Sequence, residues 1–371
     1  MAKNKGKSRR RVKGWQQKYR TGRDEVDQTH SRQKINQPQV KLGDGRFADA
    51  EGLDDLPTVE GLVVGFFPGG TLVRIDGQER ICGIAKTFRA PEGTSPLAVG
   101  DTVTVAMSED DHSGQTDKDR ADGMVLSRQP RETALARPQP RSGKRRDEHT
   151  FESFDKVIAA NMDILLIVSA VRKPRMRSGL IERFLIIAER GELTPVLVIN
   201  KIDLGDPDQA TLDLFDELSL PIYLVSAATG DGVEELLNDL AGKRSVLAGL
   251  SGVGKTTLIN RILPDVQART QEVREKDNRG RHTTTAAQVY DLPGGGMLVD
   301  TPGIRELGMH LEPSELGWYF QEFEDIAPHC RFNDCTHTHE PGCAIQQAVQ
   351  DGKILPRRYR SYLRILDSLD E

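Results

Sequence analysis

The feature that most restricts the fold is a series of apolar runs, separated by amphipathic stretches, in the middle of the chain. The amphipathic stretches lie near 178–190, 207–218 and 232–241, and a further one begins at Lys255. Fully apolar strands that alternate with helices are typical of a parallel sheet covered on both faces. We therefore expect an α/β domain, to which residues 286–300 add two strands. The apolar runs are DILLIVSAV (163–171), PVLVIN (195–200), PIYLVSA (221–227) and SVLAGL (245–250).

The segment GLSGVGKT (249–256) follows the strand of the last run and matches the pattern G-x-x-x-x-G-K-[ST]. Its glycines allow the backbone to wrap around a phosphate, and the next helix offers its positive N-terminal end to the anion. In such a loop Lys255 would reach the β- and γ-phosphates, and Thr256 would bind Mg²⁺. The residues expected to form this site are Gly249, Ser251, Gly252, Val253, Gly254, Lys255, Thr256 and Thr257.

The tetrapeptide NKID (200–203) ends an earlier strand and is suited to reading a guanine base. A carboxylate accepts hydrogen bonds from guanine N1–H and from its 2-amino group, a pairing that adenine cannot supply. We expect Asp203 to accept these bonds, Asn200 to contact the base edge and the stem of Lys201 to lie over the ring. The alternative is an ordinary exposed turn between a strand and a helix.

The small-residue loop SAATG (226–230) follows the next strand. It is expected to close over the base through Ser226 and Ala227. This loop, the phosphate loop and NKID all follow strands of one parallel sheet, whose carboxyl ends are where ligands bind.

Two polar segments near residue 300 are candidates for sensing the γ-phosphate. In VDTPG (299–303), Asp300 would hold Mg²⁺ through water and Gly303 would present its N–H to the γ-phosphate. The next residue is Ile304, at a place where many GTPases carry a glutamine that orients water. In GRHTTT (280–285), a threonine, taken as Thr284, would complete the Mg²⁺ shell, and His282 would orient the attacking water. The alternative for His282 is a solvent-exposed loop histidine.

The order of these motifs is unusual, because the guanine-reading segment precedes the phosphate loop, whereas in ordinary GTPases it follows. A binding site depends on which loops meet in space, so a circular permutation keeps the site intact while it moves the chain ends. The sequence therefore predicts a circularly permuted P-loop domain.

A cluster of cysteine and histidine lies close to the C-terminus, with the spacing C-x4-C-x-H-x5-C. Three thiolates and one imidazole are typical of a closed structural Zn²⁺ site, and four protein ligands leave no open position for catalysis. The alternatives are buried free cysteines, or His329 or His339 as the histidine ligand. Cys82 stands alone and is expected to be a core residue. The expected zinc ligands are Cys330, Cys335, His337 and Cys343.

The N-terminal part of the chain has a different character. Residues 1–23 carry ten Lys or Arg and no acidic residue, which is typical of a disordered basic arm that contacts polyanions or only aids solubility. Short β-rich runs between 58 and 107, and a closing strand MVLSRQP (124–130), predict a five-stranded barrel of the oligonucleotide-binding (OB) type, with an SH3-like barrel as the alternative. An acidic loop, 108–123, interrupts these strands.

Length and composition restrict the number of domains and the class of protein. The chain has 371 residues, 37% of them hydrophobic, and a formal net charge of −5, so it is long enough for several domains with real cores. The basic N-terminal segment has no apolar region after it, and the longest apolar run is too short to span a bilayer. We expect a cytoplasmic, monomeric protein with no membrane contact. The expected division is a disordered basic arm (1–57), an OB-type barrel (58–136), a basic linker (137–150), the permuted α/β domain (151–310) and a helical zinc-binding domain (311–371).

Taken together, the motif order, the N-terminal barrel and the C-terminal cluster resemble the RsgA/YjeQ family, the small-ribosomal-subunit-dependent GTPases. The segments PRETALARP (130–138), KVIAANMDILLIVSA (156–170) and NDCTHTHEPGCAI (333–345) resemble that family as well. The resemblance covers residues from about 58 to the C-terminus. The arm 1–57 and the acidic loop 108–123 depart from the family pattern.

The resemblance implies a GTPase that binds the small ribosomal subunit and its rRNA late in assembly, hydrolyses GTP there with Mg²⁺ and leaves. It places the family's catalytic histidine on His282. The alternatives are a P-loop ATPase or kinase, an RNA-binding assembly factor that uses GTP mainly as a conformational ligand, and a permuted GTPase of the large subunit. Contacts of Gly303 with the γ-phosphate are further expected to shift the C-terminal domain.

Overall fold

The computed structural model describes residues 56–67, 70–85, 88, 96–107, 121–138, 155–264, 287–301, 311 and 313–369. Almost all of the basic arm and of the acidic loop, and most of the linker 137–150, therefore lie outside the described residues. The domain boundaries given above stay predictions.

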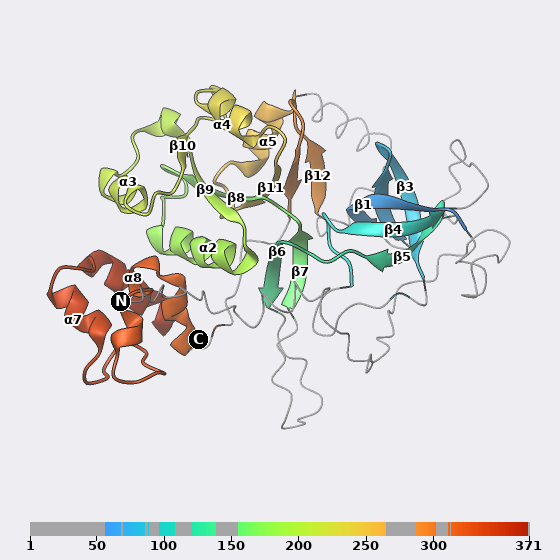
Figure 1. Cartoon of the computed structure of the whole chain (residues 1–371). Helices are drawn as coiled ribbons and strands as arrows, with labels where there is room; N and C mark the ends of the chain where they lie inside the picture. Colours follow the sequence, from blue (N-terminus) through green and yellow to red (C-terminus); the bar gives the residue numbers. More distant parts are fainter. Residues whose placement is uncertain are drawn as a thin grey trace, which may run out of the picture.

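The N-terminal strands form a closed five-stranded barrel in the order β1-β2-β3-β5-β4. All pairs in the barrel are antiparallel except β3 with β5, which is parallel. This is a Greek-key barrel of the OB type, so the predicted fold of this part is confirmed (Figure 1). Burial raises the pKa of the Cys82 thiol to about 12, as fits a core residue. The strands are β1 (Thr58–Phe67), β2 (Gly70–Ile75), β3 (Gln78–Ile84), β4 (Thr102–Met107) and β5 (Gly123–Arg128).

A two-stranded ribbon joins the barrel to the rest of the chain. Strand β6 (Ala134–Pro138) pairs antiparallel with β7 (Asp155–Ala160) and contacts the first helix of the α/β domain. Leu135 of β6 and Ala159 of β7 are fully buried in the core of the α/β domain. The ribbon thus pairs segments from either side of the predicted linker.

The α/β domain is built on a six-stranded sheet in the order β10-β9-β8-β11-β13-β12. Five strands are parallel, whereas β12 runs antiparallel to β13. The edge strand β12 thus departs from the parallel arrangement of the other five strands. The short turn LPGGG (292–296) joins β12 directly to β13, and a tight turn connects only antiparallel strands. The strands are β8 (Ile164–Ala170), β9 (Thr194–Asn200), β10 (Ile222–Leu224), β11 (Arg244–Ala248), β12 (Gln288–Asp291) and β13 (Met297–Asp300).

Helices cover both faces of this sheet, as the apolar runs predicted (Figure 1). Alternate residues of β8 enter different cores because side chains of a strand alternate between faces. Leu165 and Ile167 pack with α2 and α3, while Leu166 and Val168 pack with α4 and α5. The helices are α2 (Ser178–Gly191), α3 (Gln209–Asp216), α4 (Val233–Leu240) and α5 (Lys255–Ile262), with a 3-10 turn η2 (Ile202–Leu204) after β9.

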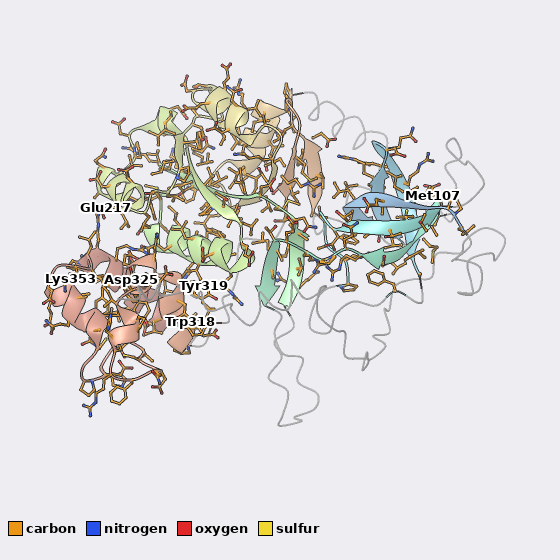
Figure 2. The ribbon with its side chains drawn as sticks, in the orientation of Figure 1. Met107, Glu217, Trp318, Tyr319, Asp325 and Lys353 are labelled. Atoms are coloured by element: carbon orange, nitrogen blue, oxygen red, sulfur yellow. The ribbon has the colours of Figure 1, made fainter. Side chains whose placement is uncertain are left out.

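The C-terminal module, residues 311 and 313–369, contains helices and no strand among its described residues. It packs around Phe320, Phe323 and Tyr362. Glu217, which follows α3, faces this module and pairs with Arg357 of α8 (Figure 2). No helix in the described part of the chain has the length and apolarity to cross a bilayer. The elements are η4 (Pro313–Tyr319), η5 (Gln321–Phe323), η6 (Ala327–His329), α7 (Ala344–Gln350) and α8 (Pro356–Asp367).

A buried ion pair fixes the segment that leads from the barrel into the ribbon. Arg131 donates from Nε to Asp101 Oδ1 and from Nη2 to Asp101 Oδ2, both at 2.7 Å, and both side chains are fully buried. Asp101 Oδ2 also accepts the N–H of Ala98 at 2.7 Å. A bidentate pair of this kind specifies geometry strongly, because either partner alone would be a buried uncompensated charge.

Replacing Arg131 should therefore be costly. We expect Arg131→Met to lower the free energy of unfolding by about 3–5 kcal/mol, because it leaves Asp101 buried and unpaired. Urea unfolding followed by circular dichroism measures the loss. The control is Lys353→Ala, which removes the exposed pair with Asp351 and should cost about 1 kcal/mol or less. Equal losses in the two variants would contradict the role given to Arg131.

Candidate nucleotide-binding site and metal centre

The side chain of Asn200 joins three loops that follow three strands of the sheet. Its Nδ2 donates to the carbonyl of Val253 at 3.0 Å, and its Oδ1 accepts the N–H groups of Lys201 at 2.8 Å and Ala227 at 2.9 Å. The residue is only 1% exposed. The segments predicted to bind base and phosphate, which are about fifty residues apart in sequence, are therefore brought together at one edge of the sheet.

The phosphate loop adopts a conformation that only glycine allows at two positions. Gly249 has a φ of 142°, and a Cβ there would lie 2.2 Å from the carbonyl oxygen of Val168. Gly254 has a φ of 99°, and a Cβ there would lie 2.3 Å from Asn200 Nδ2. The fit of this loop against β8 and Asn200 thus depends on the absence of side chains.

Helix α5 begins at Lys255, directly after the loop, so its N-terminal N–H groups face the same region. Lys255 Nζ donates to the carbonyls of Gly249 at 2.7 Å and Leu250 at 2.9 Å, which holds the ammonium group inside the loop. The side chain of Val253 is buried. Ser251, Gly252, Thr256 and Thr257 are exposed along the loop and the first turn of the helix.

Lys201 links the base-reading segment to the phosphate loop. It has a left-handed backbone, with a φ of 67°. Its Nζ donates to the carbonyl of Gly252 at 2.5 Å and to the carbonyl of Lys173 in the β8–α2 loop. Its aliphatic stem therefore spans the region between NKID and the phosphate loop, which is where the predicted base would lie.

Asp203 and Ser226 are brought together as well. Ser226 Oγ donates to Asp203 Oδ1 at 2.7 Å and accepts the N–H of Thr229 at 3.2 Å. Ser226 is fully buried, whereas Asp203 is exposed. The hydroxyl of Ser226 thus orients a carboxylate that remains accessible to a ligand.

Arg261 is a residue of this site that sequence reasoning missed. It lies near the end of α5, and its guanidinium donates from Nε to the carbonyl of Ala227 at 3.0 Å and from Nη2 to the carbonyl of Ala228. An arginine in the last turn of a helix carries no signal of such a contact. The link joins two segments more than thirty residues apart and becomes visible only in the fold.

Asp300 is the last residue of β13 and lies opposite Leu247 of β11, the strand that leads into the phosphate loop. It is half-buried. Because β11 leads directly into the phosphate loop, Asp300 lies at the edge of the sheet where that loop and the start of α5 are found. His282, Thr284 and Gly303 lie outside the described residues, and their roles stay predictions.

The four predicted zinc ligands converge in the C-terminal module. The ligand atoms of Cys330, Cys335, His337 and Cys343 all lie within 4.8 Å of one another. His337 Nδ1 is 3.5 Å from the Sγ atoms of both Cys330 and Cys343. Cys335, Cys343 and His337 are buried and Cys330 is partly buried, so the group is compatible with a closed tetrahedral zinc site.

The surroundings of the cluster hold its ligands in place. Burial lowers the pKa of His337, which favours the neutral imidazole that binds metals. Tyr359 Oη donates to the carbonyl of His337 at 2.6 Å, and Tyr362 Oη donates to that of Thr336 at 2.7 Å. Glu340 accepts the N–H groups of Thr336 at 2.7 Å and Thr338 at 3.0 Å, which fixes the loop around His337.

Comparison with known proteins decides the family. The model of the RsgA GTPase family matches residues 128–310. The small ribosomal subunit biogenesis GTPase RsgA of Shewanella oneidensis is 38% identical over 304 residues, which are 80% of this chain and 79% of the relative. The protein of the same name from Yersinia pseudotuberculosis is 35% identical over 355 residues, 93% of each chain. This chain belongs to the RsgA family of GTPases.

Solved structures of similar proteins agree with this assignment. YjeQ from Thermotoga maritima has a TM-score of 0.61 and 33% identity, and the match covers 84% of this chain and 99% of that one. YloQ, described as a circularly permuted GTPase, has a TM-score of 0.58 and 26% identity, with 85% and 96% covered. The permuted order predicted from the sequence of this RsgA-family protein is therefore confirmed.

The central position of Asn200 in this RsgA-family site leads to a prediction. We expect Asn200→Asp to weaken GDP binding by about 10- to 100-fold, because a carboxylate cannot donate to Val253 and leaves that carbonyl unsatisfied. Isothermal titration calorimetry measures the loss. The control is Asn238→Ala, an exposed change on α4 that should leave GDP affinity unchanged. Wild-type affinity in Asn200→Asp would show that the three loops do not depend on this amide.

Proposed function

We propose that this protein binds GTP and hydrolyses it on the small ribosomal subunit during late maturation, and then leaves the subunit. The observation that supports it best is the meeting of a phosphate loop with an exposed, oriented carboxylate, both tied to Asn200. The printed name of the relatives, a biogenesis GTPase of the small ribosomal subunit, supports the choice of partner. The partner surface would be the subunit's rRNA, and the protein would act as a cytoplasmic monomer.

The chemistry proposed is in-line attack of water on the γ-phosphate of GTP. The N–H groups of the phosphate loop and the N-terminus of α5 would bind the phosphates, and the ammonium group of Lys255 would leave its carbonyl partners for the more strongly attracting anion. Asp203, oriented by Ser226, would accept from guanine N1–H and the 2-amino group. This arrangement favours GTP over ATP, because adenine offers no donor at its N1.

Thr256 and Asp300 are the described residues that would hold Mg²⁺. They are an exposed hydroxyl and a half-buried carboxylate from neighbouring segments, and oxygen ligands suit this ion. When bound, Mg²⁺ neutralises charge on the β- and γ-phosphates. We propose Thr284 as a further ligand, Gly303 as a donor to the γ-phosphate and His282 as the residue that orients the attacking water.

The zinc proposal rests on the donor set of the C-terminal module. Three cysteines and the neutral imidazole of His337 match a structural Zn²⁺ site, and all four are held by one loop segment between η6 and α7. The metal would fix this loop against Tyr359 and Tyr362, and thereby the face that the module offers to its partner.

The turnover test separates the proposal from its alternatives. We expect GTP hydrolysis by the full chain to be slow alone and to rise at least about tenfold with small subunits, because a bound partner can complete the arrangement of the catalytic groups. His282→Ala should lose about 10²–10⁴-fold of the stimulated rate while GTP still binds. Phosphate release with small subunits, large subunits or neither measures this.

Each alternative gives a different result in that assay. Stimulation by large subunits would indicate the wrong subunit, and hydrolysis of ATP at the rate of GTP would overturn the base specificity. Binding of GTP without turnover would indicate an assembly factor that uses GTP as a conformational ligand. A wild-type stimulated rate in His282→Ala would remove the role given to His282.

Metal content tests the zinc site. We expect about one Zn²⁺ per wild-type chain, and its loss, with a lower melting temperature, in Cys343→Ser, because structural zinc binding contributes folding energy. Atomic emission and thermal melting measure the two effects. Cys82→Ala, which removes the buried thiol of the barrel, should keep its zinc. Zinc retained in Cys343→Ser, or absent from the wild type, would contradict the proposal.

A further inference from the structure

The backbone N–H groups of the loop 226–230 differ in whether they have a hydrogen-bond acceptor. The N–H of Ala227 donates to Asn200 Oδ1 at 2.9 Å, and the N–H of Thr229 donates to Ser226 Oγ at 3.2 Å. Between them, the N–H of Ala228 has no acceptor among the residues that the structure describes, and Ala228 is exposed. The N–H groups of Ser226 and Gly230 are bonded too, so the N–H of Ala228 is the donor of this loop that is available to a ligand among the residues described.

Arg261 determines where this open donor points. The carbonyl of Ala227 and the N–H of Ala228 belong to one planar trans peptide unit, so they point in opposite directions. Arg261 Nε holds that carbonyl at 3.0 Å on the side of α5, and Nη2 holds the carbonyl of Ala228. The N–H of Ala228 therefore faces away from the guanidinium.

The same loop also contacts the base-reading carboxylate. Ser226, two residues before Ala228, donates to Asp203 Oδ1 at 2.7 Å. The acceptor for a purine's N1–H and 2-amino group is thus bonded to the same loop that carries the open N–H donor. This pair of groups is complementary to a purine with a keto oxygen at position 6, and it opposes a purine with an amino group there.

We propose that Arg261 is a positioning residue for guanine specificity: it holds the Ala227 and Ala228 carbonyls so that the N–H of Ala228 donates to O6 of the base. This inference rests on the proposed function. Two neighbouring residues then have different roles: the N–H of Ala227 donates to Asn200, whereas the N–H of Ala228 donates to the base. Because α5 starts at the phosphate loop, one helix positions both the phosphate-binding groups and the loop that reads O6.

The experiment compares nucleotides that differ at one position of the base. GDP, IDP and 6-thio-GDP are titrated into the full chain by calorimetry, with ADP as the test of base preference. IDP keeps O6 and lacks the 2-amino group, whereas 6-thio-GDP keeps the 2-amino group and carries a weakly accepting sulfur at position 6. We expect wild-type protein to bind GDP about tenfold more tightly than 6-thio-GDP, as one hydrogen bond provides.

In Arg261→Ala, we expect GDP affinity to fall about tenfold and 6-thio-GDP affinity by less than about threefold, so that discrimination at position 6 nearly disappears. The ratio of GDP to IDP affinity should stay as in the wild type, because Asp203 is unaffected. Arg261→Lys, which can reach one carbonyl, should lie between. The KM for GTP should rise with kcat unchanged, and Arg360→Ala, an exposed arginine of α8, should bind like the wild type.

The outcomes separate the two claims. If wild-type protein does not prefer GDP to ADP, the proposed function itself fails. If it does, and Arg261→Ala weakens GDP and 6-thio-GDP equally or not at all, the role of Arg261 is wrong while the function stands. Binding of 6-thio-GDP at near wild-type affinity shows that the variant is folded.

Discussion

The nucleotide site depends on one buried amide, the side chain of Asn200. Its donor and acceptor atoms are satisfied by three backbone groups from segments that lie up to 53 residues away. A buried polar group of this kind is costly when any partner is lost, so its bonds fix the loops together and not one by one. Gly254 shows how tightly the loops fit, since the space for a Cβ there is taken by the Asn200 amide. The position of Asp203 and that of the phosphate loop follow from this junction.

A junction made in space explains why a permuted chain can build the site. The loops after β9, β10 and β11 meet at one edge of the sheet, whatever their order along the chain. Permutation instead changes what lies at the two ends of the α/β domain. At one end the β6–β7 ribbon and the Asp101–Arg131 pair connect the barrel, and Arg74 of β2 pairs with Asp291 of β12 at 2.6 Å. At the other end the chain continues from β13 into the C-terminal module.

Much of the fold and of the candidate site could be predicted because the features that define them are local in sequence. Apolar runs of strand length, a glycine-rich loop before a helix and closely spaced metal ligands each occupy a short segment. What could not be predicted depends on partners far apart. In the sequence, Arg131 is one basic residue in a polar stretch. Its role is visible only in the fold, which brings it into contact with the buried Asp101, 30 residues earlier in the chain. Nothing in the sequence distinguishes Arg261 from any other helical arginine. The sequence also does not show the direction of β12, which is set by the tight turn that joins it to β13.

The C-terminal module is also attached through a contact between residues far apart in the sequence, a buried ion pair. Arg358 of α8 pairs with Glu182 of α2 at 3.2 Å and also with Glu322, and its guanidinium lies 4.8 Å from the centre of the Phe320 ring. Burial raises the pKa of Glu182, although bonds from Ser361 and Arg358 and the charge of Arg364 oppose the rise. Burial therefore opposes the charged form of Glu182 more than these partners favour it. The cost of removing water from both charges is offset only when they meet in good geometry, so a displaced module would leave a buried carboxylate without its partner.

The Arg358–Glu182 pair thus selects one orientation of α8 on α2 more than it strengthens the contact. Since α2 follows the loop whose Lys173 carbonyl binds Lys201, the module is oriented on the same element that borders the nucleotide site.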